Sequence, residues 1–310
     1  DLRRRERTPV ALAEPGSRAA VVASAPTRLD FGGGWTDVPP WSDREGGVVC
    51  NVAIGRRATV RATPASGDAP GDEVRIPLLA AARRRVPLDG RPPALRLSGD
   101  FPAGAGLGGS SAAGVAALAA LHAWRGDDTD PAGLAEESRA LEIEELGIPG
   151  GRQDHYAAAF GGALELHFGA RTEVRRIPLA AATREALDRR CVVVYTGESR
   201  ISGRTITAVL GAYEAGDARV TAALRRMRTL AAGMAEALRQ GDVDALGAQA
   251  ELGDDVGLRH RRRNGGGGGG SAVAGTNVRQ QAGHRQRCGL RSGGLSVDAL
   301  RRLRSRRATI

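Results

Sequence analysis

The chain has 310 residues, 41% of them hydrophobic, so it is long enough to bury a core in one or two domains. Its three cysteines are far apart and odd in number, which excludes a disulfide framework and a regularly spaced zinc site and indicates reduced, buried thiols. All 45 basic residues are arginine, so a Walker A loop, which needs lysine, is excluded.

The net charge of +10 is carried by the C-terminal end of the chain. Residues 257–310 hold 13 arginines against one acidic residue, and the preceding 256 residues have a net charge of −2. No aromatic residue lies among these arginines, and aromatics make up only 3% of the chain. Because base-stacking platforms are therefore scarce, a nucleic-acid partner is not expected.

Residues 1–19 are polar and punctuated by proline and glycine, which predicts a flexible lead-in. No apolar segment follows the arginines at positions 3–5, so a signal peptide is not expected. The uncharged stretch 101–124 is too rich in glycine, alanine and serine to span a membrane. We expect a cytoplasmic protein.

From residue 20 onward, short apolar runs alternate with segments of helical periodicity, which predicts a mixed fold of helices and sheet. Strands are expected at 20–25, 47–54, 58–62, 95–97, 163–167 and 191–195. Helices are expected at 110–124, 132–146, 153–160, 206–213, 220–239 and 243–252. Past about residue 258 the pattern breaks, with six consecutive glycines at 265–270.

The first segment that indicates chemistry runs from Pro102 to Ala113, where a glycine-rich turn leads directly into the helix expected at 110–124. Glycines allow close approach of an anion, and the first turn of a helix presents unpaired N–H groups, so this is a phosphate loop that needs no lysine. The serines Ser110 and Ser111 are candidate ligands for Mg²⁺. A dinucleotide fingerprint and a purely structural turn are the alternatives.

The second segment, residues 25–40, contains three consecutive glycines followed by Trp35, Thr36 and Asp37. Exposed backbone beside a carboxylate suits the hydroxyls of a polyol, because one carboxylate accepts from two neighbouring hydroxyls. A turn capped by Asp37 is the alternative.

The third segment, residues 147–156, places Asp154 just after the turn Gly150–Gly151, with Glu142 on the preceding helix. Asp154 is a candidate general base, although an aspartate at the start of a helix is commonly a cap. Glu142 lies either on a solvated helix face or in a metal site.

These three segments, in this order, resemble the three-part signature of the GHMP kinase superfamily, which includes galactokinase, homoserine kinase and mevalonate kinase. Residues 31–40, 45–51, 150–162 and 195–200 look like the branch of D-glycero-D-manno-heptose 7-phosphate kinases and the kinase domain of L-fucokinases. The resemblance covers about residues 20–255. It implies ATP-dependent phosphorylation of the anomeric hydroxyl of a sugar, with Mg²⁺ bridging phosphate oxygens.

Carried over position by position, the resemblance implies that Asp154 is the catalytic aspartate and that Arg28 offsets charge in the transition state. It implies Mg²⁺ ligation by Glu142 and by Ser110 or Ser111. Contacts to the sugar are implied for Gly33, Gly34, Asp37, Gly151 and Arg200. The nucleotide is implied to lie on residues of the glycine-rich loop, namely Pro102, Gly104, Gly106, Leu107, Gly108, Gly109, Ser110, Ser111 and Ala112.

The implied fold is α+β, a two-lobed GHMP kinase fold with an N-terminal lobe like ribosomal protein S5 domain 2 and a ferredoxin-like C-terminal lobe. We divide the chain into the lead-in 1–19, an N-terminal lobe 20–170 with the ATP loop, a C-terminal lobe 171–257 and an aberrant tail 258–310. The family's third glycine-rich motif has its nearest likeness at 264–271, where arginines stand in place of apolar residues. Our hypothesis is a frameshifted, degenerate or disordered tail, which leaves the C-terminal lobe incomplete.

The leading functional prediction is a kinase that converts D-glycero-D-manno-heptose 7-phosphate into its 1,7-bisphosphate. An L-fucose 1-kinase and a catalytically impaired sugar-sensing relative are the alternatives, and a nucleic-acid binder ranks below both. The expected partner is a small-molecule sugar or sugar phosphate, with no nucleic acid and no membrane. A homodimer is left open.

Overall fold

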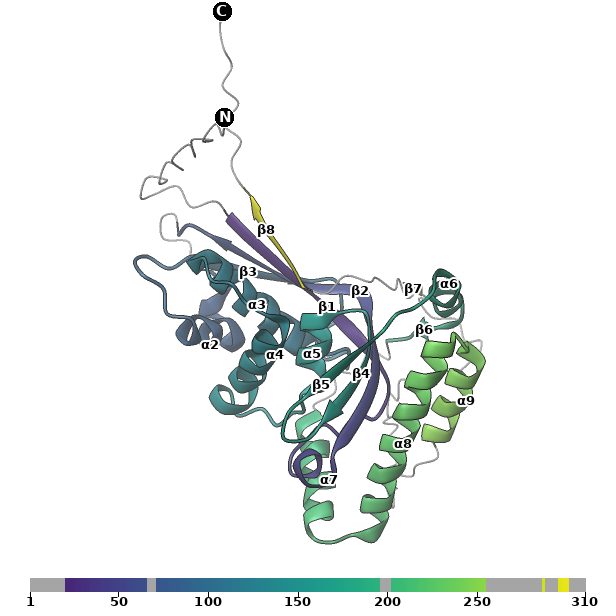
Figure 1. Ribbon diagram of the computed structural model, residues 1–310. Helices are drawn as coiled ribbons and strands as arrows, with labels where there is room; N and C mark the ends of the chain where they lie inside the picture. Colours follow the sequence, from purple (N-terminus) through teal and green to yellow (C-terminus); the bar gives the residue numbers. More distant parts are fainter. Residues whose placement is uncertain (1–19, 66–70, 196–201, 255–285, 288–294, 301–310) are drawn as a thin grey trace, which may run out of the picture.

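The computed structural model describes residues 20–65, 71–195, 202–254, 286–287 and 295–300. Within these ranges an antiparallel sheet runs in the order β5-β4-β2-β1-β8, and β3 also pairs with β2 (Figure 1). The strands are β1 (Ala20–Gly32), β2 (Gly47–Thr63), β3 (Ala94–Gly99), β4 (Ala163–Phe168), β5 (Glu173–Ile177) and β8 (Ser296–Leu300). A separate pair of short strands joins β6 (Val192–Val193) to β7 (Gln286–Arg287).

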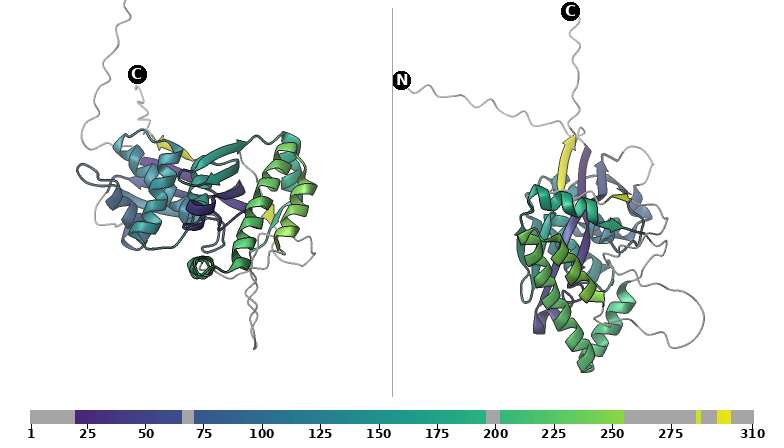
Figure 2. Two further views of the ribbon diagram at one scale, coloured as in Figure 1. Left: turned by 60° about the horizontal axis from the view of Figure 1, so that its bottom comes forward. Right: turned by 90° about the vertical axis from the view of Figure 1, so that its right-hand side faces the viewer.

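Helices lie on both sides of this sheet (Figure 1; Figure 2). One group covers one side and consists of α2 (Pro77–Arg85), α3 (Gly109–Arg125), α4 (Pro131–Ala140) and α5 (Gln153–Phe160). The other side packs against α6 (Ala181–Arg190), α8 (Ala218–Gln240) and α9 (Val243–Asp254). Shorter or peripheral elements are α1 (Trp41–Glu45), the 3-10 turn Asp72–Val74, the π-helical turn Leu141–Glu145 and α7 (Ser202–Glu214).

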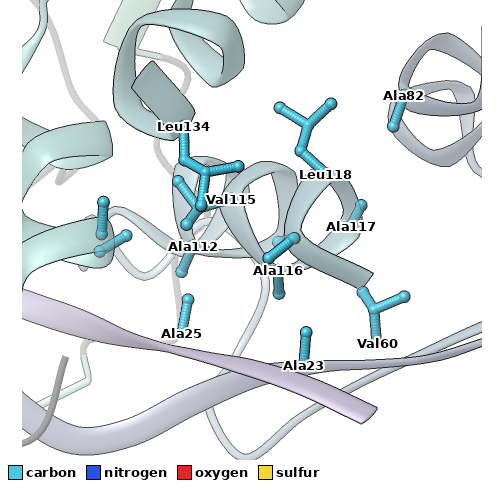
Figure 3. Packing of buried hydrophobic residues seen from close by; sticks show 14 of the residues in the cluster. Ala23, Ala25, Val60, Ala82, Ala112, Val115, Ala116, Ala117, Leu118 and Leu134 are labelled. Atoms are coloured by element: carbon cyan, nitrogen blue, oxygen red, sulfur yellow. The ribbon is translucent and has the colours of Figure 1, made fainter. Parts of the chain in front are cut away.

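Strand β2 separates two hydrophobic cores, because successive side chains of a strand point to opposite faces. Val49 lies in the core under α3, whereas Val48 and Cys50 lie in the core under α8. The first core is built mainly from small residues of α3 against β1, such as Ala116 against Ala23 (Figure 3). Small side chains let the helix approach the sheet closely, which places the N-terminus of α3 beside β1.

Several predicted elements differ from those observed. The strands expected at 47–54 and 58–62 form one continuous strand, β2, in which Arg57 is held to the neighbouring strand by a 2.8 Å bond from its Nε to Ser24 Oγ. The helix expected at 132–146 ends at Ala140 and continues as the π-helical turn. The strand expected at 191–195 is only Val192–Val193. The charged edge strand β5 was not predicted, because its alternation is largely of exposed polar residues.

Part of the segment expected to be an aberrant tail belongs to the sheet. Strand β8 pairs antiparallel with the start of β1, with Ala20 opposite Leu300 and Ser24 opposite Ser296. The glycine run 265–270 lies outside the described residues, as does the lead-in 1–19. The division of the chain at residues 170 and 257 stays a prediction.

Two further expectations concern cysteines and membranes. Cys50 and Cys191 are buried free thiols, as expected, and Cys288 lies outside the described residues. Among the helices that the structure describes, none has the length and apolar character needed to cross a bilayer.

Candidate active site

The three sequence motifs meet at Arg28, near the middle of β1. Its backbone N–H donates to Leu107 O at 3.0 Å, and its guanidinium Nη1 donates to Gly106 O at 2.8 Å. The other terminal nitrogen, Nη2, lies 2.5 Å from Asp154 Oδ1 on the first turn of α5. A single arginine therefore links the first strand, the glycine-rich loop and the predicted catalytic carboxylate.

The glycine-rich loop takes a backbone path that glycine favours. Gly104, Gly106 and Gly108 all have positive φ, between 71° and 74°. Gly108 is the N-cap of α3 in the left-handed region, and no side chain caps this helix. The unpaired N–H groups and the positive end of the helix dipole therefore attract an anion at the first turn. A dinucleotide fingerprint requires a second strand after its helix, but α3 is followed directly by α4. The geometry therefore favours a phosphate loop over a dinucleotide fingerprint.

Asp154 lies directly against the glycine-rich loop. A Cβ placed at Gly108 would be 3.2 to 3.3 Å from the Asp154 carboxyl group, so a larger residue there would press on it. The side chain of Asp154 is 29% exposed, whereas that of Arg28 is 11% exposed. Burial alone lowers the pKa of Arg28, but the surrounding carboxylates, Asp154 foremost, outweigh burial and raise it above its ordinary value. Arg28 therefore remains cationic beside Asp154.

Asp37 joins the second motif to the third. Its Oδ1 accepts from the backbone N–H of Trp35 at 3.1 Å, and its Oδ2 accepts from that of Gln153 at 3.0 Å. Only 2% of Asp37 is exposed, and this burial raises its pKa. A Cβ at Gly151 would lie 1.9 Å from Asp37 Oδ2, so the backbone must be glycine there. Asp37 thus pins the start of α5 to the turn after β1, and its contact with sugar hydroxyls stays a prediction.

The two neighbouring glycines of the second motif are required by close packing. Gly33 has φ of +94°, and a Cβ there would be 1.9 Å from Val48 O. A Cβ at Gly34 would be 2.4 Å from Asp30 Oδ2. Trp35, at φ of +77°, has a left-handed backbone conformation that is unusual for a bulky residue. This turn is held in a defined conformation beside the Asp30 carboxylate.

Glu142 lies in the π-helical turn, 7% exposed, and its carboxylate meets the start of α3. Its Oε2 accepts from Ser111 Oγ at 3.2 Å and lies 3.2 Å from His155 Nε2. The Nδ1 atom of His155 in turn lies 3.0 Å from Ser138 Oγ. Burial acts to raise the pKa of Glu142, but bonds to His155 and the two serines prevail and lower it. Glu142 is therefore held as a carboxylate.

The residues present fit a Mg²⁺ ion that is bound partly by nucleotide phosphates. Mg²⁺ prefers oxygen ligands and is commonly held by one or two carboxylates together with phosphate oxygens. Glu142 and the serines supply such oxygens next to the N-terminus of α3. Within the described ranges there is no group of three or more His, Cys, Asp or Glu side chains that would hold a metal by themselves.

Residues 78–162 match the family described as GHMP kinases N terminal domain. The chain contains a GHMP kinase N-terminal domain. In the structure this domain holds the glycine-rich loop, Glu142 and Asp154, while Arg28 reaches it from β1.

Two curated proteins are similar to about seven-tenths of this chain. A D-glycero-alpha-D-manno-heptose 7-phosphate kinase of Campylobacter jejuni is 27% identical over 246 residues, which cover 71% of this chain and 72% of that protein. A bifunctional fucokinase/GDP-fucose pyrophosphorylase of Arabidopsis thaliana is 26% identical over 258 residues. These cover 72% of this chain and 24% of the plant protein, so the chain spans about a quarter of that relative.

Solved structures have the same fold. A D-glycero-D-manno-heptose 1-phosphate kinase from Bacteriodes thetaiotaomicron superposes with a TM-score of 0.63 at 23% identity, covering 78% of this chain and 80% of that one. The phosphomevalonate kinase of Streptococcus pneumoniae in complex with phosphomevalonate and AMPPNP gives a TM-score of 0.60 at 15% identity, covering 76% and 80%. The predicted α+β GHMP kinase fold is therefore confirmed.

Three residues of the candidate site, one on β1 and two on α5, were not predicted. Asp30, Gln153 and His155 belong to the quoted motifs but received no role. A signal for Asp30 was present, because residues two apart in a strand share a face and Asp30 is two residues after Arg28. Gln153 and His155 could not be assigned, since their partners are distant in the sequence. Arg200, predicted to contact the sugar, lies outside the described residues.

Proposed function

We propose that the chain is an ATP-dependent sugar kinase that phosphorylates the anomeric hydroxyl of D-glycero-D-manno-heptose 7-phosphate to give the 1,7-bisphosphate. The observation that carries this proposal is the placement of Arg28 between the loop carbonyl of Gly106 and the carboxylate of Asp154. The similarity to the Campylobacter jejuni protein named a heptose 7-phosphate kinase supports the choice of sugar. We expect the protein to act in the cytoplasm.

Nucleotide binding is assigned to the residues from Pro102 to Ala112. The left-handed glycines bring backbone N–H groups toward the phosphates, and α3 directs its positive end at them. Glu142 together with Ser110 or Ser111 would hold Mg²⁺, which when bound neutralises charge on the phosphate oxygens.

Asp154 accepts the proton of the sugar hydroxyl as that oxygen forms a bond to the transferred phosphorus. The bond from the phosphorus to the leaving oxygen of ADP breaks in the same displacement. Arg28, kept cationic by its carboxylate neighbours, holds Asp154 in place and offsets the negative charge that develops. Asp37 holds the first turn of α5, and hence Asp154, through its bond from Gln153 N–H.

The test is a sugar-panel assay with coupled ADP detection, in the presence of ATP and Mg²⁺. Asp154→Asn keeps the shape of the side chain and removes its basicity, so we expect kcat/KM to fall by about 10²- to 10⁴-fold. The matched control is Asp128→Asn, an exposed aspartate on the loop after α3, which should leave turnover unchanged. Equal turnover by wild type and Asp154→Asn would contradict the role of Asp154. Lack of turnover on every sugar by the wild type would favour the impaired sugar-sensing relative.

An L-fucose 1-kinase is the second candidate, supported by the similarity to the plant fucokinase. The two substrates differ in their carbon skeleton and in a phosphate group that only the heptose carries, for which Arg200 is the predicted contact. Comparing kcat/KM for heptose 7-phosphate and for L-fucose decides between them. A higher value for L-fucose would overturn the heptose assignment and leave the kinase assignment standing.

A further inference from the structure

A group of polar side chains lies where β1 meets the first turn of α5. Three of their buried atoms have no hydrogen-bond partner within the part of the chain that the structure describes. They are Arg28 Nε, Asp30 Oδ1 and Gln153 Oε1. Gln153 is 7% exposed, and its Nε2 donates to the other oxygen of Asp30 at 3.2 Å. Arg28 and Asp30 lie two residues apart on β1 and therefore share one face. The three side chains thus form one polar group, which we call the Arg28–Asp30–Gln153 cluster.

Such a group calls for a ligand, because native structures rarely leave buried polar atoms unpaired. The other atoms of these side chains have partners: Arg28 bonds to Gly106 and Asp154, and Asp30 accepts from Gln153. The unpaired atoms are therefore what remains after the protein has made its own contacts. Asn51, directly opposite Asp30 on β2 and fully buried, also has both amide atoms unpaired, which extends the polar lining.

The chemistry of the unpaired atoms selects the ligand. Arg28 Nε is a donor, whereas Asp30 Oδ1 and Gln153 Oε1 are acceptors. Two acceptors do not suit a phosphate oxygen, and a fixed guanidinium repels a cation. A hydroxyl group both accepts and donates, so neighbouring hydroxyls of a polyol match all three atoms. The pKa of Asp30 is about 6, raised chiefly by burial, so this acceptor is mainly ionised at neutral pH.

The position of the cluster assigns it to the acceptor substrate. Gln153 immediately precedes Asp154 on α5, and its backbone N–H is bound by Asp37. We propose that the Arg28–Asp30–Gln153 cluster binds a non-reacting hydroxyl of the acceptor sugar and that Asp30 and Gln153 thereby determine which sugar is accepted. This inference rests on the proposed function. It adds two specificity residues to the site described above.

The variants Gln153→Met and Asp30→Asn test the proposal, because each keeps the approximate size of the side chain. Gln153→Met removes the amide, both its acceptor and its bond to Asp30, whereas Asp30→Asn replaces one acceptor oxygen with a donor. Gln240→Met, on the exposed end of α8, is the matched control. The probes are heptose 7-phosphate, L-fucose and a series of their monodeoxy analogues. For each combination of protein variant and sugar we would measure KM and kcat. Calorimetry without ATP would measure sugar binding by the full chain.

We expect Gln153→Met to raise KM for the accepted sugar by about tenfold or more, with kcat changed by less than about threefold, because a hydroxyl is left without its partner. The analogue that lacks this hydroxyl should bind wild type and variant equally, and KM for ATP should not change. Losses of the same factor for every analogue would overturn the proposal and indicate a bound water or a structural role. A change confined to KM for ATP would also overturn it and point to the nucleotide ribose.

The outcomes separate this inference from the proposed function. If the sugars are phosphorylated but the variants change KM equally for every analogue, the specificity role is contradicted and the kinase assignment stands. If the protein binds the analogues with affinities that depend on the cluster but phosphorylates none of them, the kinase assignment is contradicted and the cluster is supported as a sugar site. Circular dichroism of each variant identifies a loss of folding. If one of the two variants, Asp30→Asn or Gln153→Met, does not fold, the kinetics of the other decide the test.

Discussion

At the scale of single residues, the site depends on a few charges that the fold holds close together. Arg28 is nearly buried, yet it stays cationic because Asp154 and Asp30 lie beside it. The cost of burying these groups is offset by their mutual attraction and by hydrogen bonds to the backbone. Removing one member therefore leaves another charge buried with fewer partners, which makes conservative substitutions the most informative ones.

Asp30 provides a test of this electrostatic balance. Burial raises its pKa from 3.8 to about 6, so between these values the folded chain retains a proton that the unfolded chain has lost. The contribution of Asp30 to stability therefore falls as pH rises from about 4 to 6 and stays low above 6. An asparagine at this position does not titrate, so the stability of the Asp30→Asn variant lacks this pH dependence. The charged groups facing Asp30 are Arg28, Asp37 and Asp154, and the neutral Cys50 thiol, whose pKa burial raises, also lies nearby.

We expect the free energy of unfolding of Asp30→Asn, relative to wild type, to increase from pH 4.5 to pH 7 by an amount of the order of 1–3 kcal/mol. Urea unfolding at the two pH values measures it. The other carboxylates titrate in both proteins and largely cancel in the comparison. A difference that does not vary with pH would show that Asp30 has an ordinary pKa in the folded chain.

At the scale of elements, the start of a helix is determined by one or two local contacts. Helix α4 begins after Asp130, whose Oδ1 accepts from the backbone N–H groups of Ala132 and Gly133, both at 2.9 Å. Helix α8 begins in the same way after Asp217. Helix α3 has no such side-chain cap, and its free N–H groups face the glycine-rich loop. We assign phosphate binding to these N–H groups of α3.

Asp130→Ala should lower the free energy of unfolding by about 1 kcal/mol, because two backbone donors lose their acceptor. Thermal unfolding monitored by circular dichroism checks this value. Asp128→Ala, two residues earlier and also exposed, is the control and should be close to neutral. Turnover in the sugar-panel assay should be unchanged in both, since neither residue is part of the candidate site. A neutral Asp130→Ala would contradict the capping role.

At the scale of the whole molecule, β1 and β2 connect two cores that lie on opposite faces of the sheet. Leu118 of α3 is fully buried in one core, and Leu238 of α8 is 1% exposed in the other. The glycines Gly32 and Gly33 let α8 approach the end of β1, since a Cβ at Gly32 would collide with Met234 and one at Gly33 with Ala231. Both cores therefore contribute to the position of the strand that carries Arg28.

Leu118→Ala and Leu238→Ala should each destabilise the protein by about 2–5 kcal/mol, through lost burial and the cavity left behind. Because both cores share β2, we expect each variant to keep a single unfolding transition in differential scanning calorimetry. Leu252→Ala, at an exposed site of α9, should cost far less. Two separate transitions in either core variant would show that the two faces of the sheet unfold independently.

Local chemistry made much of this protein predictable from its sequence. The glycine-rich turn before α3, the helices α3, α5 and α8, and the position of Asp154 at a helix start all depend on residues close together in the chain. The concentration of positive charge in residues 257–310 was likewise a property of composition alone.

The tertiary structure alone decided which of these features meet. The contact between Gln153 and Asp30 spans 123 positions in the chain, and that between Asp37 and Gln153 spans 116. Two predicted strands became the single strand β2 because it pairs with β1 on both sides of an irregularity, with Arg57 opposite Pro26 and Ala53 opposite Arg28. Such pairings are determined by packing of the two cores against the sheet, which no local pattern records. Arg28 and Asp154 were therefore predictable as separate residues, whereas the polar cluster around them follows only from the fold.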